Sequence, residues 1–111
     1  MLMQSADPKD RVFKALADPT RRSILGLLGE ESRSVADLTR HFAISQPAVS
    51  QHLKVLRDSG LVSERAEGRR RLYRLEAEPL AEARAWLDEH VLFWAGGLEK
   101  LGEHLRRKHG S

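Results

Sequence analysis

Apolar side chains recur every three or four residues along most of the chain, a spacing that is typical of amphipathic helices. Asp-Pro pairs at residues 7–8 and 18–19 each combine a capping carboxylate with a proline that the first helical turn accepts. The pattern therefore predicts two consecutive helices, one beginning at each proline, and the second ends near Gly29.

Two further helices are predicted close together within residues 34–59. Ser34, with Asp37 three residues later, forms a variant of the capping box and starts a short helix that extends to Phe42. Ser45 caps a longer helix, and only a tight turn fits between the two. The segment is therefore predicted to be a helix-turn-helix. The residues that its second helix is expected to bury are Val49, Leu53 and Leu56.

After Gly60 the apolar period changes to two residues, which is typical of strands. Residues 61–66 and 70–75 are predicted to pair across a three-residue turn, Glu67-Gly68-Arg69. Residues 61–75 would thus form a hairpin, or wing, that follows the helix-turn-helix directly.

The last predicted helix runs over residues 79–109 and would span about 46 Å at 1.5 Å per residue. Its apolar residues repeat every seven positions, as in a coiled coil, and the preceding core is too small to cover them. We expect a symmetric homodimer; the alternative is a helix that breaks at Gly96-Gly97 and folds back on its own domain. The predicted interface residues are Val12, Leu80, Leu87, Val91, Trp94, Leu98 and Leu101.

The chain of 111 residues is long enough for one domain and too short for two of ordinary size. We expect residues 1–111 to form one winged helix-turn-helix domain, mainly α with a two-stranded hairpin, and residues 1–6 to be disordered. No apolar run could span a bilayer and no signal peptide is evident, so a cytoplasmic location is expected. The absence of cysteine excludes disulfides, thiolate metal sites and cysteine nucleophiles.

Basic residues outnumber acidic ones by 19 to 16, and residues 45–75, with 7 basic and 3 acidic side chains, carry a net charge of +4. A phosphate-binding surface accounts for this concentration better than an ordinary solvated face does. Polar side chains opposite the buried stripe can reach base edges in the major groove, and the wing arginines can reach phosphates. The predicted contacts with double-stranded DNA are Ser45, Gln46, Pro47, Ser50, Gln51, Lys54, Arg65, Arg69, Arg70 and Arg71.

Several motifs within residues 12–75 resemble those of the ArsR/SmtB winged-helix repressors. They are residues 13–25, FKALADPTRRSIL, residues 44–56, ISQPAVSQHLKVL, and the wing motifs Gly60-Leu61-Val62, Gly68-Arg69-Arg70 and Tyr73-Arg74-Leu75. The resemblance implies a homodimeric bacterial repressor that binds an inverted-repeat operator in a promoter and is released by a signal.

The sequence departs from the metal sensors of that family at both of their usual sites. Residues 34–38 lack the Cys-x-Cys pair, and residues 76–79 lack the Asp-x-His pair that opens the last helix. His90 and His104 share a helix face, but one chain presents no cluster of three ligands. We therefore expect no metal and no cofactor, as in the metal-independent branch, whose members are often autorepressors.

The favoured hypothesis is a homodimeric repressor that binds a palindromic operator, with autoregulation as one form of it. The alternatives are a metal- or ligand-responsive sensor of the same fold and a winged-helix module that binds protein instead of DNA. The arginine-rich wing disfavours the protein-binding module, because interface cores are depleted of charge. No phosphate-binding glycine loop, HExxH motif or nucleophile elbow is present, so we do not expect an enzyme.

Overall fold

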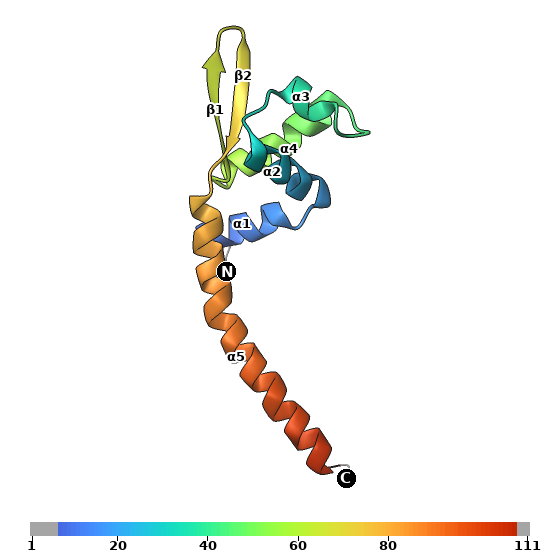
Figure 1. Cartoon of the computed structure of the whole chain (residues 1–111), viewed down its shortest axis with the longest axis vertical. Coiled ribbons are helices and arrows are strands. Elements are labelled where there is room, and N and C mark those ends of the chain that lie inside the picture. Colours follow the sequence, from blue (N-terminus) through green and yellow to red (C-terminus); the bar gives the residue numbers. More distant parts are fainter. Residues whose placement is uncertain (1–6, 109–111) are drawn as a thin grey trace, which may run out of the picture.

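The computed structural model describes residues 7–108, with the side chains of residues 7–91 and 93–97. The expectation for residues 1–6 lies outside this part of the chain. Four helices precede a hairpin and a long helix (Figure 1), in the order α1 (Pro8–Leu16), α2 (Pro19–Glu30), α3 (Val35–Thr39), α4 (Gln46–Asp58), β1 (Val62–Glu67), β2 (Arg70–Leu75) and α5 (Glu78–Lys108). The predicted fold class is confirmed.

Side-chain caps begin the first four helices at the predicted positions. The side chains of Asp7, Asp18, Ser34 and Ser45 each accept a hydrogen bond from a backbone N–H two or three residues later. Each cap satisfies a donor that would have no partner within its helix. The first four helix starts are therefore fixed by local chemistry.

The third helix is shorter than predicted. α3 ends at Thr39, because the backbone N–H groups of His41 and Phe42 bond to carbonyls three residues back and tighten the chain into a turn. Phe42 still packs against the core, from the turn between α3 and α4. The apolar spacing identified the buried residue correctly but overestimated the helix that carries it.

The core lies where α1, α2, α3 and α4 meet the hairpin and the first turns of α5. The buried stripe of α4 matches the prediction, since Val49, Leu53 and Leu56 are each at most 1% exposed. With this face buried, the opposite face of α4 is turned toward solvent. The other buried residues are Val12, Ala15, Ile24, Leu25, Leu28, Leu38, Leu61, Val62 and Ala83.

The wing has a shorter turn than predicted. Glu67 pairs with Arg70 across the antiparallel ladder, so only Gly68 and Arg69 form the turn, and the predicted three-residue turn is wrong. Gly68 adopts a φ of 62°, a conformation that glycine accepts without strain and that two-residue hairpin turns favour. At its base the wing is held by Tyr73, whose backbone exchanges hydrogen bonds of 2.8 and 3.0 Å with Arg33.

The last helix extends far beyond the rest of the domain (Figure 1). Its first turns pack against α1, where the ring centroids of Phe13 and Trp86 lie 5.6 Å apart in an edge-on arrangement. The helix continues through Gly96-Gly97, so the alternative in which it folds back is wrong. No helix in the described part of the chain is both long and apolar enough to cross a membrane.

Candidate nucleic-acid interface

The solvent-facing side of α4 carries the side chains that were predicted to contact base edges. Gln46, Pro47, Ser50, Gln51 and Lys54 are all exposed. Among the described residues, neither Ser50 nor Gln51 makes a side-chain hydrogen bond, so their donors and acceptors remain available to a ligand. This face combines small and amide side chains, which suit close approach to base edges.

Two predicted contact residues have other roles within the chain. The Ser45 hydroxyl accepts a hydrogen bond from the Ala48 backbone N–H at 3.3 Å and so caps α4. The Lys54 ammonium lies 3.0 Å from a carboxylate oxygen of Asp58, one helical turn away. Both side chains are exposed, and Lys54 would exchange an ion pair of modest strength for a phosphate contact.

A groove of about 750 Å³ runs between α4 and the wing. One of its lining residues, Arg57, was not predicted as a contact, although Ser50, Lys54 and Arg57 follow one another at spacings of four and three residues on one helix face. Tyr73 closes the groove from β2 and was named from the sequence only as part of a wing motif. The groove is lined by Gln46, Pro47, Ser50, Gln51, Leu53, Lys54, Arg57 and Tyr73.

Four of the five wing arginines form ion pairs within the described part of the chain, and Arg69 at the turn is the one that does not. Arg65 lies 3.4 Å from Glu67, and Arg74 lies 3.0 Å from Glu76, so these two pairs stay within the hairpin and its exit. The remaining two pairs involve Arg70 and Arg71, and their carboxylates also tie the wing to the helices. The positive charge that the sequence concentrates here is therefore largely balanced by nearby carboxylates.

Glu64 on β1 joins the wing to the recognition-helix candidate α4. One carboxylate oxygen accepts a hydrogen bond of 2.6 Å from Arg71, and the other, fully enclosed, lies 3.0 Å from the Arg57 guanidinium without the alignment of a hydrogen bond. The Tyr73 hydroxyl, with these two guanidinium groups, holds the pKa of Glu64 below its ordinary value. Glu64 therefore remains ionised at neutral pH and fixes the wing relative to α4.

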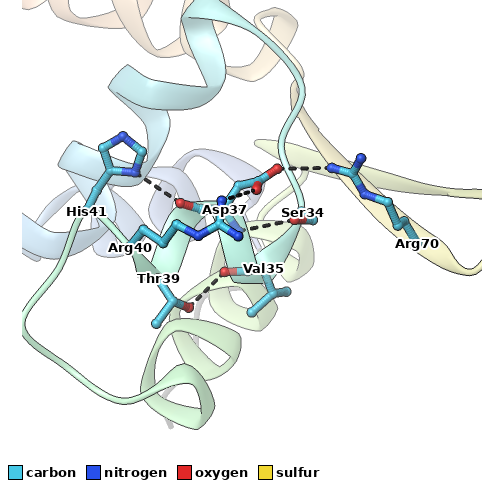
Figure 2. Close-up of polar contacts among 7 residues, drawn as sticks. All are labelled: Ser34, Val35, Asp37, Thr39, Arg40, His41 and Arg70. Carbon is cyan, nitrogen blue, oxygen red and sulfur yellow. Dashed lines mark hydrogen bonds and ion pairs between the residues drawn. The ribbon is translucent and has the colours of Figure 1, made fainter.

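Asp37 makes the second connection between the wing and a helix (Figure 2). Its carboxylate accepts hydrogen bonds from Arg70 at 3.0 Å and from Arg40 at 3.1 Å. A hydrogen bond with Ser34, followed by the charges of Arg70 and Arg40, lowers the pKa of Asp37. The contact lies beside a second hollow, of about 520 Å³, between the start of α3 and the tip of the wing.

The inner side of α4 is attached to the junction of α1 and α2. Nδ1 of His52 lies 3.4 Å from a guanidinium nitrogen of Arg21 and 3.9 Å from the Asp18 carboxylate. Arg21 in turn donates to the carbonyl of Ala15 at 2.7 Å. This polar cluster connects α4 to α1, the helix against which α5 packs.

The residues predicted for the dimer interface fall into three groups. Val12 is only 3% exposed in the protomer's own core, so almost none of its side chain is left for a partner, and Leu80 also packs against that core. Leu87, Val91 and Trp94 are exposed by 39%, 50% and 49%, which is unusual for large apolar residues. The side chains of Leu98 and Leu101 lie outside the described part of the chain.

Neither His90 nor the remaining acidic side chains assemble a metal site among the described residues, where no group of three or more His, Asp or Glu side chains is placed to hold an ion. His90 stacks on Trp86 with a centroid distance of 3.8 Å, and Nδ1 of His90 lies 2.8 Å from the Trp86 carbonyl oxygen. His104 lies outside the residues whose side chains are described.

Residues 18–64 match the family model described as a bacterial regulatory protein of the arsR family. The chain is 46% identical over 89 residues to the HTH-type transcriptional regulator Rv2034 of Mycobacterium tuberculosis, covering 80% of both proteins. It is 37% identical over 78 residues to the transcriptional repressor SdpR of Bacillus subtilis, covering 70% of this chain and 87% of that protein. The chain belongs to the arsR family.

Solved structures agree with this assignment. An ArsR-like transcriptional regulator from Rhodococcus sp. RHA1 has a TM-score of 0.77 at 30% identity, covering 86% of this chain and 88% of that one. The homodimeric winged helix-turn-helix DNA-binding domain of Mb0332 from Mycobacterium bovis has a TM-score of 0.63 at 33% identity, covering 82% and 90%. The winged helix-turn-helix is thus a DNA-binding fold of transcriptional regulators, and this supports a role other than catalysis.

Proposed function

We propose that this protein is a homodimeric transcriptional repressor that inserts α4 into the major groove of an inverted-repeat operator and places the wing along the DNA backbone. The observation that carries the proposal is the groove lined by exposed polar side chains of α4, next to a second hollow that the three arginines of the wing tip line. A helix with a small polar face fits the major groove, and neighbouring arginines supply the phosphate contacts that set its register.

The proposed dimer interface lies on α5. Leu87, Val91 and Trp94 recur on one face of this helix and are half-exposed in the single chain. A second copy would cover these apolar surfaces, and the two-fold symmetry of such a pair matches the symmetry of an inverted repeat. The relative Mb0332, described as a homodimeric DNA-binding domain, supports this arrangement.

The direction of regulation is proposed from the relatives. SdpR is named a transcriptional repressor, and a protein of Staphylococcus xylosus, 42% identical over 67 residues, is named an arsenical resistance operon repressor. A repressor acts by occupying a promoter, which requires the DNA-binding surface and the dimer but no further domain. Autoregulation would place one operator beside the gene of this protein.

Footprinting on the promoter region of its own gene tests the proposal. We expect one protected segment with inverted-repeat symmetry, and lower transcription from that promoter when the protein is added in vitro. Absence of any protected segment there, together with no enrichment of genomic fragments bound by the protein, would contradict sequence-specific binding.

The dimer is tested by placing charge on the exposed apolar face of α5. The double variant Val91→Asp/Trp94→Asp should sediment as monomers or unfold, because burying two carboxylates against a second copy is strongly unfavourable. Ala85→Asp, on the opposite side of the same helix, serves as the control and should sediment like the wild type. An unaltered dimer of the double variant would contradict the proposed interface.

A further inference from the structure

Asp37 is placed among the groups that the proposed function assigns to DNA phosphates. It belongs to α3, yet its carboxylate receives the guanidinium of Arg70 from the wing, 33 residues later in the sequence, at 3.0 Å. Arg40 approaches the other oxygen of the same carboxylate from within the helix-turn-helix, at 3.1 Å (Figure 2). One acidic side chain thus pairs with two arginines that face solvent.

The location of this contact sets it apart from the other ion pairs of the wing. The hollow beside Asp37 is lined by the three consecutive arginines of the wing tip and by Gln46, the first residue of α4. A DNA backbone that followed the wing tip toward the start of α4 would meet these arginines and the Asp37 carboxylate together. Glu64, by contrast, is enclosed between α4 and the wing, with 20% of its side chain exposed.

A guanidinium group that is held by a carboxylate must leave it before it can neutralise a phosphate. Arg70 is 58% exposed and Asp37 31% exposed, so the pair lies within reach of solvent and can exchange partners. A pair of this exposure stabilises the chain only modestly, so DNA can displace it, but the exchange reduces the benefit of the phosphate contact. The carboxylate left behind also repels the phosphate.

We propose that Asp37 competes with DNA phosphates for Arg70 and thereby limits how tightly the protein holds DNA of any sequence. The inference rests on the proposed DNA-binding function and adds to it a residue that tunes the backbone contacts. Because phosphates are common to all sequences, Asp37 weakens binding to operator and random DNA by the same factor. Its role is thus separate from that of the base-contacting face of α4.

The test replaces Asp37 with asparagine in the full chain and measures binding to a short, fluorescein-labelled random-sequence duplex by anisotropy. We expect Asp37→Asn to bind about two- to fivefold more tightly at low salt, with a steeper dependence of log K on log salt. The Ser34 cap of α3 is retained, because it accepts a hydrogen bond from the backbone of residue 37. Asp88→Asn, which removes the same charge from an exposed position on α5, is the control and should change binding much less.

A double-mutant cycle with Arg70→Ala separates competition for Arg70 from the general effect of removing an acid. In the Arg70→Ala background, the improvement from Asp37→Asn should fall to less than half, leaving only the release of Arg40 and reduced repulsion. The same improvement in both backgrounds, an equal improvement from Asp88→Asn, or unchanged or weaker binding by Asp37→Asn would overturn the inference. If Asp37→Asn does not fold, as judged by circular dichroism, Asp37→Ser repeats the test.

The outcomes also separate this inference from the proposed function. A wild-type protein that binds neither random nor promoter DNA would refute the proposed function. A wild-type protein that binds DNA while Asp37→Asn binds it no better would refute only the role of Asp37.

Discussion

The recognition-helix candidate α4 and the wing lie side by side but present their polar groups in opposite ways. On α4, Ser50 and Gln51 are exposed and make no side-chain hydrogen bond within the described residues. On the wing, most arginines form ion pairs with carboxylates. Asp37 of α3 pairs with Arg70, and Glu64 of β1 pairs with Arg71. Exposed neutral side chains hydrogen-bond to water, so leaving them without a protein partner costs little free energy. A cluster of like charges repels itself and is stabilised by nearby opposite charges.

This difference suggests a division of work between the two regions. Unpaired amides and hydroxyls on a rigid helix are suited to reading bases, because no internal bond has to be broken when they meet DNA. Paired arginines are suited to contacts with the DNA backbone. The net strength of each contact depends on the carboxylate that the arginine must leave to reach a phosphate. Variants of each region test this division, and the largest effect is expected at the wing tip.

Removing the arginines of the wing tip should weaken DNA binding most. We expect the triple variant Arg69→Ala/Arg70→Ala/Arg71→Ala to bind operator and random DNA more weakly by the same factor, on the order of a hundredfold at low salt. The factor is the same because phosphate contacts carry no sequence information. The slope of log K against log salt should fall by roughly one unit for each phosphate that the variant no longer neutralises. Anisotropy titrations of both duplexes at several salt concentrations measure both effects, and weaker binding to the operator alone would reverse the assignment.

Truncating Gln51 should affect only the specific complex. We expect Gln51→Ala to lose about 1–3 kcal/mol of binding free energy for the operator, which is the range of a good bidentate base contact, and far less for random DNA. Val55→Ala, one turn further along the same exposed side of α4, is the control, because Val55 has no side-chain group that can hydrogen-bond a base edge. An equal loss on both duplexes would assign Gln51 to the backbone instead of the bases.

Single arginine variants should separate the free cation from the paired ones. Arg69 makes no ion pair among the described residues, whereas Arg71 donates to Glu64 at 2.6 Å. Arg69→Ala should therefore weaken random-DNA binding more than Arg71→Ala, by about two- to fivefold. Equal losses would indicate that the ion pairs of the wing have no influence on DNA affinity.

Acid should weaken the wing pairs without altering the neutral side chains of α4. The hydrogen bond with Ser34 lowers the pKa of Asp37, and the Tyr73 hydroxyl lowers the pKa of Glu64. A lowered pKa stabilises the fold above the carboxyl's ordinary pKa, and this contribution is lost as pH falls through the lowered value. The contribution of Asp37 and Glu64 to the thermal unfolding temperature should therefore be nearly constant from pH 6 down to about pH 5. It should decline below about pH 4.

Glu64→Gln is the matched variant for the acid experiment. It should be less stable than the wild type at neutral pH, because Arg57 and Arg71 lose their counter-charge, and it should lose less stability on acidification. The same acid-induced loss in variant and wild type would show that Glu64 does not contribute to it.

Metal ions should not change the affinity for the operator. The chain has no cysteine, and the described residues form no cluster of three His, Asp or Glu side chains. After treatment with a chelator, one equivalent of zinc, cadmium or arsenite per protomer should leave operator affinity unchanged in anisotropy titrations. Release of DNA by one equivalent would assign a sensing role to residues such as His90 and His104.

The parts of the fold that follow from short-range chemistry were predictable from the sequence. A cap such as Ser45 and a buried stripe such as Val49 and Leu53 depend on residues within two helical turns, so the pattern contains them. The turn of the wing depends on which residues pair across the ladder, and this register made Glu67 a strand residue instead of a turn residue.

The contacts that distinguish the wing from α4 were not predictable in the same way. Asp37 and Arg70 meet across 33 residues, and no periodicity signals that encounter. The sequence shows only an excess of arginine, because counting charges does not reveal which of them are paired. Val12 illustrates a related limit, since an apolar position at helical spacing can face its own core as well as a partner.

The length of α5 has a consequence for how the protein responds to its own abundance. The helix has 31 residues and extends far beyond the domain (Figure 1), and under the proposed assembly Leu87, Val91 and Trp94 remain exposed to water until two chains meet. Folding of this region and association are then one equilibrium, which depends on protomer concentration. Where protomers are scarce, promoter occupancy rises with the square of their number, so a modest change in expression produces a steep change in transcription.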